Sequence, residues 1–388
     1  MKDINTHPNS FNAYALFANN GYSQGFENKL LVGDLMVENE NLLGSENEKF
    51  VFYNYDYKNE IENLNTKNFS PLKFPQRCFF EAKEEINFNS LDEFISQTNY
   101  TCPNLKIIAK TSKKEYLENV KKLKDHIQKG NIYEINYCIT FEAFDVKINP
   151  IEIYSRLNSI SKAPYSAFVK LNDKYIISSS PELFLSKRGK NLITKPIKGT
   201  APRSENTNED LQIKNILQNS LKERSENVMI VDVARNDLSH IASRGSVNVN
   251  ELYKIESYNQ VHQMVSTISC EVKENILLDD IIKATFPMAS MTGAPKIRAM
   301  QLVDDFETQN RGPYSGCIGY LKPNGDFDLS VLIRSIFYNE TERYLSFSVG
   351  SAITHLCEAE KEYEECLLKA KALMEVLGTS GSGFGVRS

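Results

Sequence analysis

The sequence lacks the features that mark membrane, secreted and nucleic-acid-binding proteins. None of its apolar runs is long enough to span a bilayer, and the first thirty residues contain no apolar segment of the kind found in secretory signals. The formal net charge of the 388 residues is only −5, so electrostatics give no reason to expect nucleic acids or anionic membranes as partners. We therefore expect a soluble cytoplasmic protein.

The short motifs that identify nucleotide and zinc sites are also missing. The sequence contains no GxxxxGKS/T, no GxGxxG after a strand and no HExxH. Its seven cysteines include no CxxC pair and are odd in number, which is typical of reduced, mostly buried thiols in a reducing compartment. Chemistry at a P-loop, a Rossmann glycine motif or an HExxH zinc site is therefore not expected.

The patterns that are present predict a large folded domain of the α+β class. An apolar share of 41% is enough to build a core, and helical and strand patterns follow one another in mixed order. A capping box at Ser112 and Glu115 predicts the start of the first clear helix. We expect a strand-rich N-terminal region at 1–110 packed on the core, a main domain at 111–377, and a mobile Gly- and Ser-rich tail at 378–388.

An acid and an amine flank a predicted β-hairpin. The runs 183–187 and 192–195 read as its two arms, with Glu182 just before the first arm and Lys198 just after the second. A hairpin brings both arms to one cleft, where a carboxylic acid and an amine serve as general acid and nucleophile. Gly199 would let the backbone approach a ligand closely. A surface Glu and a surface Lys beside a turn give the same pattern.

Two acidic pairs stand on predicted helices. Glu223 and Glu226 are three residues apart, as are Glu362 and Glu365, and residues three apart share one helix face. Two such faces meeting across a cleft would form an all-oxygen site, which suits Mg²⁺. A solvated acidic face paired with neighbouring lysines is the plainer interpretation.

A run of small residues from 285 to 296 precedes a helix that Pro295 would open. Such a loop at the end of a strand is a candidate cradle for an anion. An ordinary strand-to-helix connection has the same composition.

Seven separated motifs carry a family resemblance when they are taken together. They are GNIYEIN (130–136), SSSPELF (178–184), PIKGTAPR (196–203), SENVMIVDVARNDL (225–238), TGAPKIRAM (292–300), RGPYSGCIGY (311–320) and EKEYEECLLKAKAL (360–373). In this order they resemble the chorismate-utilising enzymes, which include anthranilate, aminodeoxychorismate, isochorismate and salicylate synthases. The resemblance implies a large mixed β-sandwich of two halves, flanked by helices, with the active site between the halves.

The resemblance also implies a role for each candidate residue. Lys198 matches the lysine typical of the aminodeoxychorismate branch, which attacks ring carbon 2 of chorismate, and Glu182 matches the acid that protonates the departing 4-hydroxyl. Ammonia then attacks carbon 4 and expels the lysine, giving 4-amino-4-deoxychorismate for p-aminobenzoate and folate synthesis. Glu226 and Glu365 match direct Mg²⁺ ligands, with Glu223 and Glu362 as the second pair. The positions that match substrate contacts are Thr292, Gly293, Tyr314, Arg334, Gly350, Ser351, Ala352, Gly199 and Thr200.

One departure from the family pattern bears on the reaction. Glu134 stands where the water-adding synthases have a base lysine and the ammonia-using branches commonly have Gln, which argues against water addition. No glutamine amidotransferase domain is recognisable, so we expect a separate subunit of that kind to supply ammonia. Formation of anthranilate, isochorismate or salicylate is the alternative within the family, and a binding subunit without activity is the alternative outside it.

Overall fold

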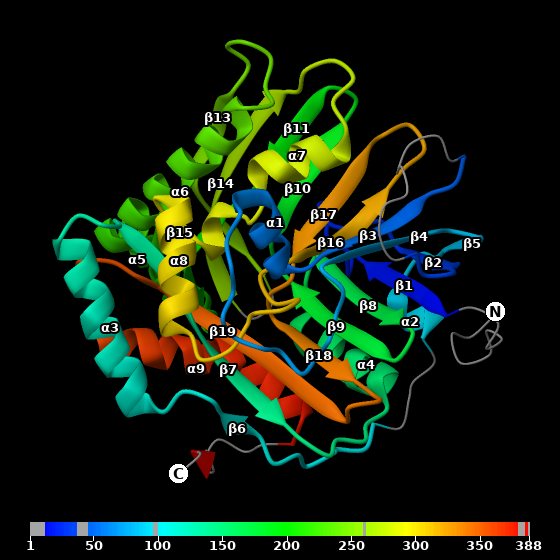
Figure 1. The fold of residues 1–388 in the computed structure, drawn as a ribbon, viewed down its shortest axis with the longest axis horizontal. Helices are drawn as coiled ribbons and strands as arrows, with labels where there is room; N and C mark the ends of the chain where they lie inside the picture. Colours follow the sequence, from blue (N-terminus) through cyan, green and yellow to red (C-terminus); the bar gives the residue numbers. More distant parts are fainter. Residues whose placement is uncertain (1–11, 37–45, 96–99, 259–260, 379–384, 387–388) are drawn as a thin grey trace.

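Two large β-sheets form the body of the protein (Figure 1). The computed structural model describes residues 12–36, 46–95, 100–258, 261–378 and 385–386. The larger sheet runs in the order β20 (Gly385–Val386), β6 (Ile108–Ala109), β7 (Glu134–Ala143), β19 (Tyr344–Ile353), β18 (Ser335–Asn339), β9 (Lys174–Ser180), β8 (Tyr165–Leu171), β1 (Ala13–Ala18), β2 (Lys29–Gly33) and β5 (Glu84–Asn87), with β15 (Gly293–Ala294) paired to β7.

The smaller sheet contains the predicted hairpin. It runs in the order β12 (Ile197–Pro202), β14 (Val261–Glu271), β11 (Asn191–Thr194), β10 (Leu183–Arg188), β17 (Phe327–Val331), β16 (Cys317–Leu321), β3 (Lys49–Tyr53) and β4 (Arg77–Glu81), with β13 (Asn248–Ser257) paired to β14. The arms β10 and β11 pair antiparallel around Gly189, whose φ of +56° suits a glycine in the turn. The hairpin prediction is therefore confirmed.

The helices divide between the two sheets. They are α1 (Lys58–Glu62), α2 (Leu91–Phe94), α3 (Lys113–Gln128), α4 (Pro150–Ser161), α5 (Thr207–Asn219), α6 (Leu221–Ser239), α7 (Leu278–Thr285), α8 (Lys296–Phe306) and α9 (Ala359–Val376), with 3₁₀ turns at Tyr55–Tyr57 and Ala289–Met291. Helices α3, α4 and α9 pack with the larger sheet, whereas α5 and α6 pack with β12, β13 and β14 of the smaller sheet (Figure 1). The α+β sandwich that the sequence predicted is confirmed.

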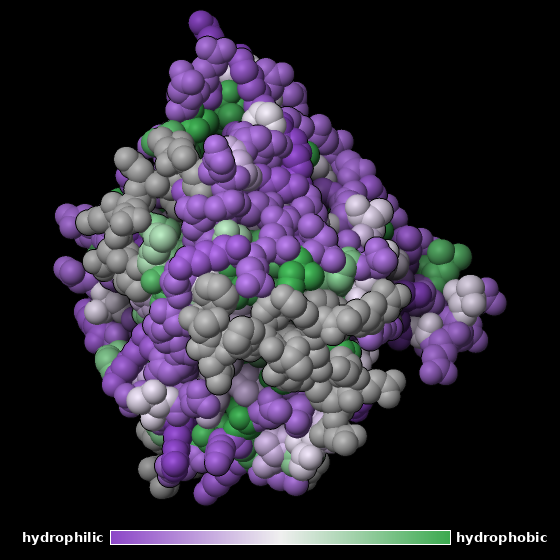
Figure 2. Space-filling view, turned by 90° about the vertical axis from the view of Figure 1, so that its right-hand side faces the viewer, coloured by the Kyte–Doolittle hydropathy of each residue, from purple (hydrophilic) through white to green (hydrophobic). Residues whose placement is uncertain are grey.

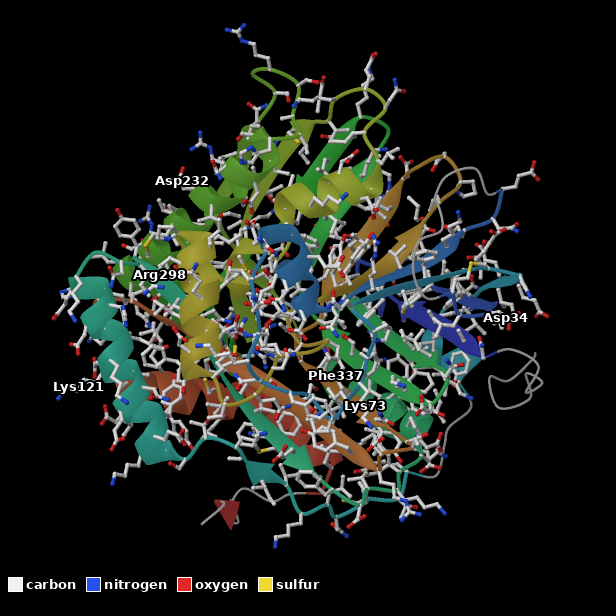
Figure 3. The ribbon with its side chains drawn as sticks, in the orientation of Figure 1. Asp34, Lys73, Lys121, Asp232, Arg298 and Phe337 are labelled. Atoms are coloured by element: carbon white, nitrogen blue, oxygen red, sulfur yellow. The ribbon has the colours of Figure 1, made fainter. Side chains whose placement is uncertain are left out.

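Aromatic side chains join the two sheets in the core. Phe17 of β1 lies edge-on to Tyr320 of β16, with ring centroids 5.4 Å apart, and both side chains are fully buried. Figure 3 shows Phe337 of β18 in the interior, while Lys121 and Asp232 project outward from α3 and α6. A second hydrophobic cluster lies between the larger sheet and helices α3, α4 and α9. Hydrophobic side chains thereby cover both sheets, and neither sheet forms a domain of its own.

The chain crosses between the sheets at two places that matter below. Strand β9 of the larger sheet ends at Ser180, and β10 of the smaller sheet begins at Leu183, so Glu182 lies on the crossing. Strand β17 of the smaller sheet likewise passes to β18 of the larger sheet through 332–334. These crossings bring polar residues to the seam between the two halves.

Local signals set several of the element boundaries. The Ser112 hydroxyl accepts a hydrogen bond from the Glu115 N–H at 3.1 Å and so caps α3, as the capping box predicted. The helical pattern at 208–236 is interrupted, however, because Ser220 has an extended backbone and caps α6 with its side chain. The segment 285–296 follows helix α7, so the prediction that it ends a strand is wrong.

The two ends of the chain take part in the sheets where the structure describes them. Strands β1, β2 and β5 belong to the larger sheet, and β3 and β4 to the smaller one. Most of the expected mobile tail, at 379–384 and 387–388, lies outside the described residues. The helices of the described part include none with the length and apolar composition needed to cross a membrane. The face shown in Figure 2 is mostly hydrophilic, with hydrophobic residues in small separate patches.

Candidate active site

A cavity lies at the seam between the two halves. It encloses about 710 Å³ of atom-free space, part of it open to solvent, which is within the usual range for small-molecule sites. Strands of both sheets and helices α6 and α9 contribute to its wall. The lining residues that the sequence singled out for chemistry or binding are Glu182, Lys198, Gly199, Thr200, Glu223, Glu226, Tyr314, Arg334, Gly350, Ala352 and Glu365.

Glu182 has the properties of a general acid. Its carboxyl group is buried at the crossing from β9 to β10, and its Oε1 accepts a hydrogen bond of 3.4 Å from the backbone N–H of Ile197. Burial raises the pKa of Glu182 to about 7, because the charged form is poorly solvated there. A carboxyl group with this pKa keeps its proton near neutrality and gives it up when a leaving group needs it.

Lys198 lies on β12, next to Ile197, and is 8% exposed. Its Nζ lies 2.6 Å from Oε1 of Glu134 on β7, so the ion pair joins the two sheets. Burial alone would lower the pKa of Lys198, but the nearby carboxylates of Glu134, Glu226 and Glu182 outweigh it and raise the pKa. The amine is therefore protonated at neutral pH in this arrangement.

Gly199 allows β12 to lie against helix α6. Its φ is +88°, and a Cβ atom added there would lie 2.9 Å from Oε2 of Glu223 and 3.2 Å from the Leu217 side chain. A side chain at this position would be strained and would also push Glu223 away. The glycine therefore fixes the distance between the lysine strand and the acidic helix.

Three of the four predicted metal ligands surround one ammonium group. The Nζ of Lys222 lies 2.6 Å from Glu362, 3.8 Å from Glu226 and 3.9 Å from Glu223. Burial raises the pKa of Glu226 to about 8, and it also raises those of Glu223 and Glu362. The two acidic faces predicted on α6 and α9 do meet across the cavity wall.

The fourth carboxylate belongs to a second cluster. Glu365 lies 2.6 Å from the Nζ of Lys369, whose charge lowers the pKa of Glu365 although burial acts to raise it. Lys369 also donates a 2.8 Å hydrogen bond to the Gly350 carbonyl, and Arg334 donates one of 3.1 Å to the Lys369 carbonyl. The plainer interpretation of the acidic pairs, in which the neighbouring lysines Lys222 and Lys369 form ion pairs with them, is confirmed in this respect.

The donor atoms of these carboxylates suit a metal ion better than the distances between them do. Within the described ranges, no three carboxylate, imidazole or thiolate side chains stand close enough to hold an ion together. The donors are nevertheless all oxygens, and the buried Oε2 of Glu362 has no hydrogen-bond partner in the part of the chain that the structure describes. Hard oxygen donors of this kind fit Mg²⁺.

The predicted substrate contacts divide into two groups. Tyr314, Arg334, Gly350, Ala352, Gly199 and Thr200 line the cavity, whereas Thr292, Gly293 and Ser351 do not. The Thr292 hydroxyl donates to the carbonyls of Met288 and Ala289, and the Ser351 hydroxyl pairs with Tyr116 at 2.8 Å. Gly293 lies against β7, where an added Cβ would lie 2.2 Å from the Glu134 carbonyl oxygen. In this structure Thr292, Gly293 and Ser351 therefore lie behind the residues of the cavity wall and do not face the cavity.

Several polar residues outside the predicted substrate contacts also line the cavity. Asn136 and Ser348 face it from β7 and β19, Gln263 from β14, and Ser290 from the 3₁₀ turn. Among the described residues, the buried Oε1 of Gln263 has no hydrogen-bond partner. The alternation of side chains along a strand shows which residues share a face. When both faces of the sheet are buried, it does not show which face borders a cavity.

Comparison with known proteins agrees with this geometry. The sequence profile described as chorismate binding enzyme matches residues 14–375. The chain belongs to the chorismate binding enzyme family. Aminodeoxychorismate synthase component 1 of Salmonella typhimurium is 38% identical over 263 residues, which are 68% of this chain and 57% of that protein. The Bacillus subtilis protein of the same name is 36% identical over 70% of this chain and 57% of its own length.

Solved structures of an anthranilate synthase component and of an isochorismate synthase have the same fold. Anthranilate synthase component I from Streptococcus pneumoniae superposes with a TM-score of 0.74 at 24% identity, covering 94% of this chain and 92% of its own. The menaquinone-specific isochorismate synthase from Escherichia coli gives 0.72 at 15% identity, covering 94% and 88%. At these identities the likeness extends to the fold alone.

Proposed function

We propose that this chain is an aminodeoxychorismate synthase component 1, which aminates chorismate at carbon 4. The single observation that carries the proposal is that a lysine amine and a carboxyl group with a raised pKa line the same buried cavity. Relatives with that name at 36–38% identity support the choice of reaction. A non-catalytic binding subunit would have no need of such a costly buried pair.

The first step is a displacement that makes a covalent bond to Lys198. Its uncharged Nζ attacks ring carbon 2, the ring double bonds shift, and the bond between carbon 4 and its hydroxyl oxygen breaks. Glu182 gives its proton to that oxygen, which leaves as water. A positioned general acid of this kind contributes roughly 10²–10⁴-fold to the rate.

The second step releases the enzyme. Ammonia attacks carbon 4, the double bonds shift back, and the bond between carbon 2 and Nζ breaks. The new ammonium on carbon 4 returns a proton to the Glu182 carboxylate, which restores the acid. Two displacements with an amine leaving group replace one difficult substitution of a hydroxyl.

The charge of the cavity supports a requirement for Mg²⁺. Besides Glu182, which carries its proton, five carboxyl groups lie in or beside the cavity, those of Glu134, Glu223, Glu226, Glu362 and Glu365, with four cations, those of Lys198, Lys222, Arg334 and Lys369. Chorismate adds two more negative charges. Glu226 and Glu365, with Glu223 and Glu362, would hold Mg²⁺, which supplies positive charge for the ring carboxylate. Arg334 would bind the other carboxylate of the substrate.

A second subunit is part of the proposal. The related proteins are named component 1, which supports a partner that releases ammonia from glutamine. We therefore expect the isolated chain to use ammonium salts, and to use glutamine only with an amidotransferase subunit present.

Product analysis tests the proposed function. Purified protein is incubated with chorismate, Mg²⁺ and ammonium salt, and the products are separated by chromatography and weighed by mass spectrometry. We expect 4-amino-4-deoxychorismate. Anthranilate, isochorismate or salicylate as the main product would replace the proposal by another reaction of the family, and unchanged chorismate would refute catalysis.

A further inference from the structure

Glu134 is a buried carboxylate that the steps above leave unused. It is 0% exposed and lies on β7 of the larger sheet, outside the lining of the cavity and behind Lys198. Its Oε1 lies 2.6 Å from the Lys198 Nζ. Neither Oε1 nor Oε2 has a hydrogen-bond partner of good geometry among the residues that the structure describes, so the contact with Lys198 is an ion pair only. Burying a carboxylate with one charged neighbour and an unpaired oxygen is costly, so this position calls for an explanation.

The covalent step creates a proton problem at the same place. Attack on carbon 2 requires an uncharged amine, but the carboxylates around Lys198 hold its pKa above the ordinary value. The proton must therefore leave the amine before the bond forms. Bulk water is a poor acceptor here because Lys198 is buried, and a substrate bound in the cavity would displace water from it.

The contacts of Lys198 single out one acceptor. Four carboxylates act on its amine: Glu134 from β7, Glu226 from α6, Glu365 from α9, and Glu182 from the crossing before β10. Glu182 must carry its own proton for the leaving hydroxyl, and Glu226 and Glu365 are committed to Lys222 and Lys369. Only Glu134 forms an ion pair with the Lys198 Nζ in the described structure.

We propose that Glu134 is a positioning and proton-accepting residue that takes the proton from Lys198 before attack and returns it after release. The inference rests on the proposed function, because it assumes that Lys198 is the nucleophile. One proton passes from Nζ to a Glu134 oxygen, and the neutral amine forms its bond to carbon 2. When that bond breaks, the amine leaves uncharged and Glu134 gives the proton back, so the enzyme ends the cycle as it began.

The pH dependence of Glu134→Gln distinguishes this role from a structural one. In the wild type the proton moves from Lys198 to Glu134, so the pair holds the same number of protons before and after the transfer. The fraction of enzyme with an uncharged amine therefore does not change with pH. In the Gln variant the proton must leave to water. We expect the ratio of wild-type to variant kcat/KM to fall about tenfold for each pH unit between pH 5 and 7, because one proton is lost to solvent. Titrations common to both proteins cancel in this ratio.

Two further variants complete the test. Glu134→Asp retains a carboxylate, so the ratio of wild-type to variant kcat/KM should stay constant with pH even if the rate is lower. Glu142→Gln is the matched control: Glu142 is a buried carboxylate on the same strand that accepts a 2.8 Å hydrogen bond from Tyr344, far from the amine along β7. A ratio for Glu134→Gln that is independent of pH would overturn the inference, since a structural loss slows the enzyme equally at every pH.

Chemical labelling gives the same comparison without turnover. Acetic anhydride acetylates free amines, and the rate at Lys198 can be followed by peptide mass spectrometry. We expect the labelling rate of Lys198 to rise about tenfold per pH unit in Glu134→Gln and to change little in the wild type over the same range. Equal slopes would overturn the inference. If the wild type makes no aminated product, the proposed function fails, and labelling still decides the role of Glu134.

Discussion

At the scale of single residues, the amine of Lys198 and the carboxyl of Glu182 carry the proposed chemistry. Replacing Lys198 by Ala removes the nucleophile, so we expect formation of the 4-amino product to fall by about 10³-fold or more. Residual turnover should shift toward the 2-amino isomer, because ammonia can then reach carbon 2. Lys198→Arg keeps the positive charge without a nucleophilic amine and should be equally impaired. Near-normal rates in either variant would contradict covalent catalysis, as measured by quantitative product chromatography.

The raised pKa of Glu182 also predicts how stability depends on pH. Burial raises this pKa from 4.5 to about 7, so the folded state prefers the protonated form. The stability associated with the proton is fully present below pH 4.5 and is lost as the pH rises through 7. The shift corresponds to about 3 kcal/mol of unfolding free energy.

The variant Glu182→Gln cannot ionise and tests that prediction. Its unfolding free energy relative to the wild type should increase between pH 5 and 8, while its activity falls by roughly 10²-fold or more. Denaturant titrations at several pH values measure the first quantity. A difference in stability that does not change with pH would show that Glu182 is not held in its protonated form.

At the scale of elements, the approach of β12 to α6 determines where the acidic helix lies. Gly199→Ala should lower the unfolding free energy by about 1–2 kcal/mol, because the residue adopts a positive φ, and should also weaken the response to Mg²⁺ by displacing Glu223. Gly189→Ala is the matched control, since its φ is +56° and no atom of the described residues lies within 4 Å of an added Cβ. Melting curves with and without Mg²⁺ compare the two variants. Equal Mg²⁺ responses would contradict the proposed link.

The faces of α6 and α9 should together bind the metal. Glu226→Gln is expected to weaken Mg²⁺ binding at least about tenfold, as measured by calorimetric titration of the protein, and chelation of Mg²⁺ should abolish activity. Asp232→Asn lies on the outward face of the same helix, where Asp232 pairs with Arg235 at 3.0 Å, and should bind Mg²⁺ normally. Unchanged affinity in Glu226→Gln would remove this carboxylate from the metal site.

Sequence patterns could predict individual helices and strands better than they could predict which of these elements pack together. The capping box at Ser112 and the hairpin around Gly189 depend on residues a few positions apart, and both predictions are confirmed. The break at Ser220 was missed because the apolar spacing continues across it, whereas the backbone turns to cap α6. The segment 285–296 was predicted to follow a strand, but it follows helix α7. A short buried apolar run is compatible with either a strand or a helix.

At the scale of the whole molecule, the site depends on the two crossings between sheets. The sequence could predict that Glu182 and Lys198 lie near one cavity, because they flank one hairpin. It could not predict that the lysine strand β12 pairs with β14 and not with the hairpin. The ion pair between Glu134 and Lys198 joins strands of different sheets, and sequence spacing does not report such long-range pairing. The family resemblance implies substrate contacts at Thr292, Gly293 and Ser351, but these residues do not line the cavity.

The most direct test of the central claim is to look for chorismate bound covalently to Lys198. The wild type is mixed with chorismate and Mg²⁺ without ammonia, quenched rapidly, and analysed by intact mass and peptide mapping. The account predicts a mass gain equal to chorismate less one water, located on Lys198 and absent from Lys198→Arg. Turnover to the 4-amino product with ammonia, but no adduct on Lys198 at any quench time, would contradict it.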